Sequence, residues 1–266
     1  MVKKFGKNLY LGLVLLFLYA PIIILILFSF NESKSRGTWT GFTFKWYAKL
    51  FSDPETMNAL YVTLSMAIIT AIVATLIGTV AAIGIHSMKK WPKALCMNVS
   101  YLPILNPEIV TAVSLMILFV FAKLDLGYFT MLLGHITFSI PYVILSIMPK
   151  LQQMNKHSYE AAMDLGCTPV QAVRKVILPE IMPGVITGAI MAFTLSLDDF
   201  VISFFTSSGV KNLSVHIYSM ARRGIDPQIN ALSALMFVAV LLLLIIVNVR
   251  TARDAKKQNK NGGVMD

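Results

Sequence analysis

The sequence predicts an all-α, polytopic membrane protein with six transmembrane helices, and three observations lead to this fold class. The 266 residues are 56% hydrophobic and 14% charged, and the mean hydropathy is +0.71, which leaves too little polar surface for a water-soluble globule. The apolar residues gather in six runs, each of about the 20 residues that cross a bilayer. Short polar, basic or aromatic segments separate these runs.

The spans are expected at 9–30, 57–85, 94–122, 128–148, 183–206 and 229–249, within one transmembrane domain over 1–266. The first run is long and no small-residue cleavage site follows it, so we expect it to be retained and not removed as a signal peptide. Pro103 and Pro107 interrupt the third run. A proline removes a backbone hydrogen bond, which is tolerated at membrane depth only beside protein or a water-lined cavity.

The distribution of basic residues predicts the orientation. Fifteen of the 23 Lys and Arg residues fall on the face that holds both termini, the 86–93 turn and the 150–182 loop. Basic loops stay in the cytoplasm, so this face is predicted to be cytoplasmic. The net charge of +10 fits anionic lipid headgroups. The two cysteines, Cys96 and Cys167, are expected to be free thiols.

The 150–182 loop is predicted to hold two short helices. The first covers 158–165 and stops at Gly166; the second starts at the N-cap Thr168, is closed by Gln171 in a capping box and ends at Pro179. Two helices joined at a glycine also suggest a DNA-binding helix-turn-helix. Basic and acidic residues balance over 156–180, so the basic face that phosphate binding needs is missing and we expect no nucleic-acid partner.

Within this loop Glu160-Ala161-Ala162, then Gly166 and then Leu178-Pro179, resemble the EAA signature of ABC-importer permeases, with Val176 where Ile is usual. The resemblance implies a type I importer permease whose loop is a coupling helix seated in an ATPase subunit. The implied coupling positions are Glu160, Ala161, Ala162, Gly166, Leu178 and Pro179. No phosphate loop, hydrolase motif or Cys/His metal spacing occurs, so we expect no enzymatic activity, no cofactor and no metal, with ATP bound by the partner ATPase.

Three acids stand inside apolar runs: Glu108, Asp198 and Asp199. A carboxylate at the bilayer centre costs roughly 2.5 to 3.5 kcal/mol, so each needs a reason. They could line a translocation path and attract cations. Alternatively, Glu108 starts a helical turn capped by Asn106, and the two aspartates mark a helix restart or pair with a neighbouring subunit. Adjacent residues on a helix point about 100° apart, so Asp198 and Asp199 are expected to differ in role.

Aromatic and histidine side chains leave two interpretations open. The ring of Trp46 could stack on an ammonium group, or it could anchor a span at the headgroup level. The isolated residues His135, His157 and His216 are interpreted as structural.

Several longer segments (GFTFKWYAKLF, the break at 107–110, GHITFSIPYVI, EAAMDLG and FTLSLDDFVISFF) together resemble the second permease of bacterial spermidine/putrescine transporters over nearly the whole chain. Pro169 departs from that pattern, at a position where an acid can occur. The resemblance implies a bacterial cytoplasmic membrane location and import of polyamines with a second permease, two ATPase subunits and an extracytoplasmic polyamine-binding protein. The polyamine-contacting positions that it implies are Trp46, Glu108, Ser196, Asp198 and Asp199.

Three other functions remain open from the sequence. An ABC permease for another solute, such as ferric ion or an anion, would share the loop but would not explain three acids. A cation-coupled secondary transporter would explain the acids but not the EAA loop. A membrane scaffold or sensor would explain neither feature.

Overall fold

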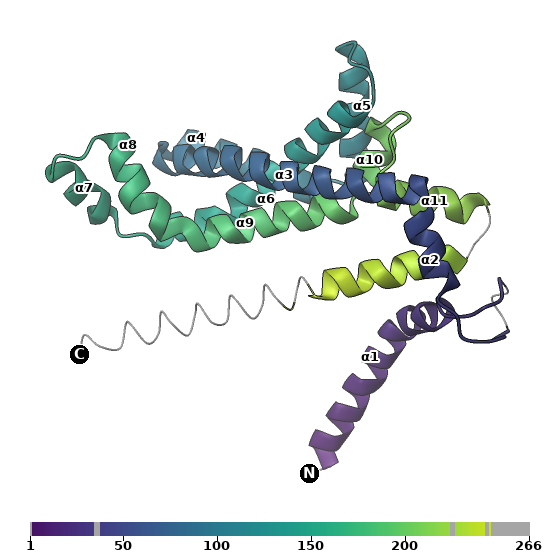
Figure 1. The fold of residues 1–266 in the computed structure, drawn as a ribbon. Helices are drawn as coiled ribbons and strands as arrows, with labels where there is room; N and C mark the ends of the chain where they lie inside the picture. The colour runs from purple at the N-terminus through teal and green to yellow at the C-terminus, as the bar shows by residue number, and fades with distance from the viewer. Residues whose placement is uncertain (1, 35–37, 224–226, 243–244, 246–266) are drawn as a thin grey trace. The chain divides into compact units, whose positions relative to one another are not determined.

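The computed structural model describes residues 2–34, 38–223, 227–242 and 245, apart from the side chains of 2–8 and 156 (Figure 1). In this part of the chain the structure is helical, with one isolated bridge between Asn31 and Phe42. Two compact units are present, one formed by 1–57 with 219–266 and the other by 58–218. Each is described by itself.

The first unit contains α1 (Val2–Phe28), α2 (Lys45–Ser52), the start of α3 (Pro54–Ser87), the end of α11 (Leu213–Arg223) and a helix over Pro227–Leu242. Asn31 organises the loop after α1, because its side chain bonds the carbonyl of Thr38 and the amide of Thr40, both at 2.9 Å. The ring of Phe30 lies 5.1 Å from that of Phe42 and 5.2 Å from that of Tyr47. Aromatic contacts therefore fix the start of α2 against this loop.

The second unit contains most of α3, followed by α4 (Lys90–Leu105), α5 (Glu108–Phe121), α6 (Tyr128–Gln153), α7 (Lys156–Asp164) and α8 (Pro169–Ala172). A π-helical turn, η1 (Val173–Ile177), leads into α9 (Leu178–Asp198) and then α10 (Val201–Thr206). Helices α3, α6 and α9 run side by side (Figure 1) and share one apolar core.

Small residues allow α3 and α9 to approach α6 closely. A Cβ on Gly78 of α3 would lie 2.7 Å from Cγ1 of Val143, and one on Gly188 of α9 would lie 3.1 Å from the same atom. A Cβ on Gly184 would lie 3.0 Å from the carbonyl oxygen of Ser146. Small side chains at helix contacts are typical of membrane proteins, where close packing replaces the hydrophobic drive for association.

Four described helices are long and apolar enough to cross a membrane, or five if the bent pair α4 and α5 is one span. They correspond to the first five predicted spans. The sixth predicted span, 229–249, begins in the described helix Pro227–Leu242 and continues beyond the described residues. The predicted number of six is compatible with this arrangement. The basic tail from Arg250 lies outside the described residues.

The predicted end of a helix at Pro179 is wrong. The helix runs without interruption over Pro169–Asp198, a length of 30 residues, and Pro179 lies in the first turn of α9. The wider turn of η1 explains this, because the amide of Leu178 bonds to the carbonyl of Val173, five residues back. A π-turn displaces the backbone carbonyls that a proline ring would otherwise meet, so the chain passes Pro179 without a break.

Candidate functional site: a carboxylate-lined cavity at two helix breaks

The first break separates α4 from α5. Their axes bend by 107° at Asn106 and Pro107. The proposed capping of α5 by Asn106 is wrong, because Asn106 ends α4, where its amide bonds the carbonyl of Leu102, and α5 has no side-chain cap. Glu108 is exposed in the first turn of α5, where a negative charge complements the helix dipole.

The second break separates α9 from α10. Helix α9 ends at Asp198, Asp199 takes up a non-helical conformation with ψ of 126°, and α10 begins at Val201. The break therefore gives the two adjacent aspartates different directions.

The two breaks meet at a cavity of about 360 Å³. Its lining residues include all three intramembrane acids and three aromatic residues, together with apolar and polar residues of α4, α9 and α10 and the segment between α4 and α5. None of the eleven lining residues, all in the described chain, is Lys, Arg or His. They are Pro103, Ile104, Asn106, Glu108, Phe138, Tyr142, Leu195, Asp198, Asp199, Phe200 and Val201. Such a lining attracts positive charge and offers rings for cation–π contact.

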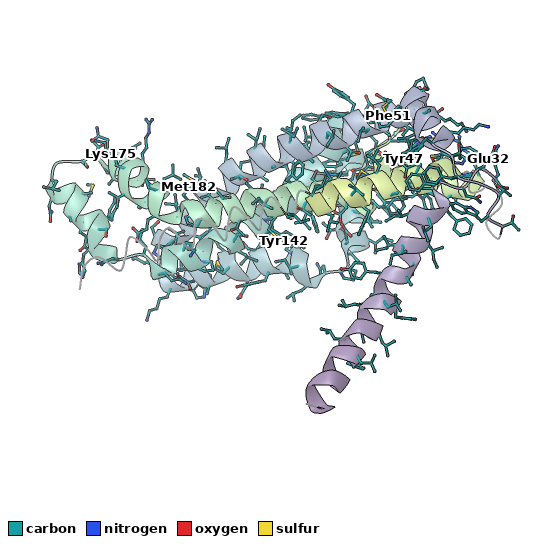
Figure 2. The ribbon with its side chains drawn as sticks, turned by 60° about the horizontal axis from the view of Figure 1, so that its bottom comes forward. Glu32, Tyr47, Phe51, Tyr142, Lys175 and Met182 are labelled. Carbon is teal, nitrogen blue, oxygen red and sulfur yellow. The ribbon has the colours of Figure 1, made fainter. Side chains whose placement is uncertain are left out.

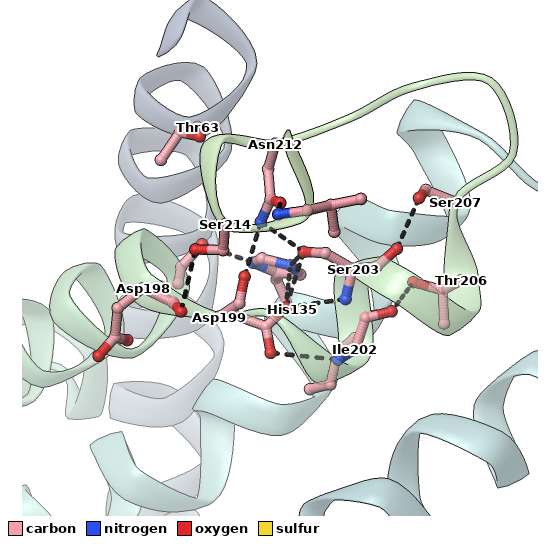
Figure 3. A network of polar contacts seen from close by, with 12 residues as sticks. Thr63, His135, Asp198, Asp199, Ile202, Ser203, Thr206, Ser207, Asn212 and Ser214 are labelled. Atoms are coloured by element: carbon pink, nitrogen blue, oxygen red, sulfur yellow. Dashed lines mark hydrogen bonds and ion pairs between the residues drawn. The ribbon is translucent and has the colours of Figure 1, made fainter. Parts of the chain in front are cut away.

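Asp198 and Asp199 have opposite environments in this cavity. The side chain of Asp198 is exposed and points away from the polar cluster, as Figure 3 shows. Asp199 is 6% exposed. Its carboxylate accepts hydrogen bonds from the backbone amides of Ile202 (3.2 Å) and Ser203 (2.8 Å) and from the Ser203 hydroxyl (2.7 Å). Asp199 thus closes the first turn of α10.

His135 of α6 is the centre of the buried cluster behind Asp199. Its Nε2 lies 3.2 Å from Oδ2 of Asp199 and 2.9 Å from Oγ of Ser203, and its Nδ1 lies 2.6 Å from Oγ of Ser196 (Figure 3). The amide of Asn212 donates to the Asp199 carbonyl at 2.7 Å and to the Ser203 hydroxyl at 2.8 Å. Ser196, predicted to contact polyamine, therefore faces His135 and does not line the cavity.

Trp46 belongs to the first unit and is 3% exposed. Its indole Nε1 donates to the carbonyl of Asn31 at 2.7 Å. The ammonium groups of Lys45 and Lys49 each lie 5.8 Å from the ring centroid. The indole is therefore buried and hydrogen-bonded within the first unit, and both anchoring at the headgroup level and cargo contact by Trp46 stay predictions.

The coupling segment, residues 156–182, forms as predicted around Gly166. Gly166 has a φ of +85°, and the amides of Gly166 and Cys167 return to the carbonyls of Met163 (2.9 Å) and Ala162 (3.1 Å), which is a Schellman end. The capping box of Thr168 and Gln171 is confirmed. Both cysteines are free thiols, as expected.

The exposed surface of this segment contains several predicted coupling positions. Glu160 and Ala161 are exposed on α7, whereas Ala162 is 8% exposed. Leu165 and Val170 expose 86% and 77% of their area. His157 lies beside Glu160 on this surface, with its Nδ1 3.2 Å from Oε2 of Glu160, and its structural role stays a prediction.

The last two predicted coupling positions lie at the start of α9. Leu178 packs against the core that α3, α6 and α9 share, while Pro179 is exposed. Lys175 of the preceding turn, labelled in Figure 2, is also exposed. The segment therefore offers a surface of mixed apolar and charged character.

The fold and the site together define a polytopic membrane permease, with apolar spans, an acidic cavity between broken helices and an exposed helical segment between spans. A family model described as "Binding-protein-dependent transport system inner membrane component" matches residues 1–253. The chain belongs to this family, whose members are membrane subunits of transport systems.

Relatives and solved structures agree with this assignment. The chain is 36% identical over 260 residues to the spermidine/putrescine transport system permease protein PotC of Escherichia coli (strain K12), covering 97% of this chain and 98% of PotC. It is 36% identical over 251 residues to the putrescine transport system permease protein PotI of the same organism, covering 91% and 89%. A bacterial ABC transporter that imports the acidic polysaccharide alginate has the same fold, with a TM-score of 0.70, 18% identity and coverage of 95% and 98%.

Proposed function

We propose that this chain is the permease subunit of an ATP-driven importer that carries polyamines across a bacterial cytoplasmic membrane. The observation that carries the cargo assignment is the cavity, where Glu108 and Asp198 line one space with Tyr142 and Phe138 and without a basic residue. A polyamine is a flexible chain with separated ammonium groups, which such carboxylates and rings would bind. The named cargoes of PotC and PotI support the same cargo.

The fold by itself does not decide the cargo. The importer of alginate has a similar fold, yet alginate is an acidic polysaccharide. Function depends on the side chains grafted onto a fold, so the negative lining of the cavity is the discriminating feature. This lining disfavours an anion as cargo, because like charges would repel in a low-dielectric site.

The proposed machinery needs other polypeptides. We expect a second permease, two ATPase subunits and an extracytoplasmic polyamine-binding protein, with this chain itself non-catalytic. The coupling segment would seat in the ATPase through Glu160 and the exposed Leu165 and Val170. The cytoplasmic placement of this segment and of both termini rests on the bias of basic residues.

The test removes charge while keeping side-chain shape. Glu108→Gln and Asp198→Asn should each lower spermidine uptake at least about tenfold in membrane vesicles, since loss of one partner of a desolvated ion pair costs on the order of 2 to 5 kcal/mol. The loss should be greater for spermidine, with three ammonium groups, than for putrescine, with two. The amount of assembled complex should not change.

Asp125→Asn is the matched control. Asp125 is exposed in the turn between α5 and α6 and does not line the cavity. This variant should keep the ratio of spermidine to putrescine uptake. Normal uptake by both Glu108→Gln and Asp198→Asn would remove the cavity from the cargo path.

A further inference from the structure

We propose that His135 is a positioning residue for the cargo site. It holds Asp199 where the carboxylate caps the first turn of α10. Of the two aspartates, only Asp198 then presents its charge to the cargo, together with Glu108. This inference rests on the proposed function and refines its site, since it separates cargo contact from support. Helical geometry predicts that two adjacent aspartates differ in role, but it does not say which of them faces the cargo.

The first step is the hydrogen-bonding capacity of Asp199. Both carboxylate oxygens already accept bonds from the first turn of α10, Oδ1 from Ile202 and Oδ2 from the amide and hydroxyl of Ser203. The imidazole of His135 adds a contact to Oδ2 at 3.2 Å. Three of these four contacts go to Oδ2, and Asp199 is only 6% exposed, so an ammonium group would compete with the turn of α10 for this carboxylate. A buried donor that loses its partner is destabilising.

The second step is the position of His135. It is 2% exposed and comes from α6, a helix that also supplies Phe138 and Tyr142 to the cavity wall. Through Nδ1 it contacts Ser196 of α9, and through Nε2 it contacts Ser203 of α10. One imidazole therefore links the helices on both sides of the break at 199–200.

The third step connects this link to Asp198. The break is further fixed by Asn212, which donates to the Asp199 carbonyl, and by Ser214, whose hydroxyl donates to the Asp198 carbonyl at 3.2 Å. The backbone carbonyls of Asp198 and Asp199 are thereby held. The side chain of Asp198, a residue of the cavity lining, points away from the cluster (Figure 3). Pre-organised charge of this kind binds cargo without a reorganisation cost.

Replacing His135 by glutamine or by asparagine distinguishes the roles of its two ring nitrogens. A glutamine places its amide near the position of Nε2 and keeps a donor toward Asp199, whereas an asparagine places its amide near Nδ1 and keeps only the contact to Ser196. His135→Asn should therefore impair transport more than His135→Gln. Asp199→Asn should resemble His135→Asn, and the double variant should lose no more than the stronger single variant, because the two residues act as one unit.

The experiment uses membrane vesicles from cells that express the complete transporter. His135→Asn and Asp199→Asn should raise KM for both polyamines, because the Asp198 carboxylate is no longer held, and should change the ratio of spermidine to putrescine uptake less than Asp198→Asn, which removes the charge. Asp198→Asn should raise KM and should lower spermidine uptake more than putrescine uptake. If His135→Asn or Asp199→Asn changed the spermidine to putrescine ratio as Asp198→Asn does, the proposed division of roles would be overturned.

A second measurement does not depend on transport. In a background with Cys96→Ser and Cys167→Ser, Asp198→Cys is labelled with a cationic thiol reagent. Adding His135→Asn or Ser203→Ala should change the labelling rate at least about threefold, and adding His135→Gln should change it less. Equal rates in all backgrounds would overturn the positioning role. If wild-type vesicles take up neither polyamine, the cargo proposal fails, while labelling still decides the role of His135.

Discussion

Glu160 and Gly166 serve the coupling segment in two different ways. Glu160 offers an exposed carboxylate, whereas Gly166 supplies a left-handed backbone conformation. Glu160 and its neighbour His157 expose 68% and 84% of their side chains. An exposed pair of this kind contributes little to stability. Gly166 has a φ of +85°, which a residue with a Cβ adopts only under strain.

Glu160→Ala is expected to lower transport-linked ATP hydrolysis or to release the ATPase, because it removes the charge offered to that partner. Competition between spermidine and putrescine for uptake should stay unchanged, which vesicle uptake with both polyamines measures. His157→Ala is the control, since it removes the surface contact but keeps Glu160. If His157→Ala matched the loss in Glu160→Ala, the role of Glu160 would lie within this chain and not in the ATPase contact.

Gly166→Ala should lower ATPase coupling through the backbone, at a cost of about 1 to 3 kcal/mol for the strained conformation. No neighbouring atom lies within 4 Å of the added Cβ, so crowding is not the cause. Gly166→Asn tolerates this conformation better and should retain more ATP hydrolysis. Equal hydrolysis in Gly166→Ala and wild type would contradict the requirement for a left-handed residue.

At the level of single residues, sequence reasoning found the acids but not their supports. Glu108 and Asp198 could be predicted because a charge within an apolar run is conspicuous. The direction of Asp199 could not, since it depends on where α9 breaks. His135 is conspicuous as a polar residue in an apolar span, but its partners Ser196 and Ser203 lie 61 and 68 residues away in sequence. Such contacts follow from packing alone.

Among the elements, α3 and α9 both pack closely against α6, where Val143 contacts Gly78 of α3 and Gly188 of α9. Apolar length predicted each of these helices. Their mutual contact was not predicted, because Gly78 and Gly188 give no periodic signal until α6 places Val143 against both. The continuation of α9 through Pro179 was missed for a related reason, since the π-turn that accommodates it has no pattern in the sequence.

Gly78→Ala should lower the melting temperature of the purified complex, by the equivalent of about 1 to 3 kcal/mol, because its Cβ would lie 2.7 Å from Val143. Val143→Ala should partly rescue it by freeing that space. Gly84→Ala on the same helix is the control, because no atom lies within 4 Å of its Cβ. It should be neutral or stabilising by up to about 1 kcal/mol. A stable Gly78→Ala variant would contradict the tight contact.

For the whole molecule, hydrophobic runs predicted the class of fold, and the family match confirms a transport-system membrane component. The assignment of 1–266 to one transmembrane domain stays a proposal. The two compact units, 1–57 with 219–266 and 58–218, were not predicted, because the first joins segments from opposite ends of the chain. Only tertiary contacts reveal such a pairing.

This chain reconstituted alone should not take up polyamine, because one coupling segment and one set of spans supply half of a two-fold pore. Purification from native membranes should recover a second permease, an ATPase and an extracytoplasmic binding protein. Proteoliposomes that contain this chain together with these three partners should show ATP-dependent spermidine uptake. Uptake by the single polypeptide, driven by an ion gradient, would instead identify a secondary carrier.

The uninterrupted helix Pro169–Asp198 physically connects the coupling segment to the cavity that is proposed to bind cargo. Its 30 residues make a rod of about 45 Å, with Thr168 of the coupling segment at one end and Asp198 at the other. A tilt of about 5° at the first end displaces the far end by about 4 Å, roughly the separation of two paired charges. Leverage along a single helix would thus let a small tilt at the coupling segment withdraw a carboxylate from the proposed cargo.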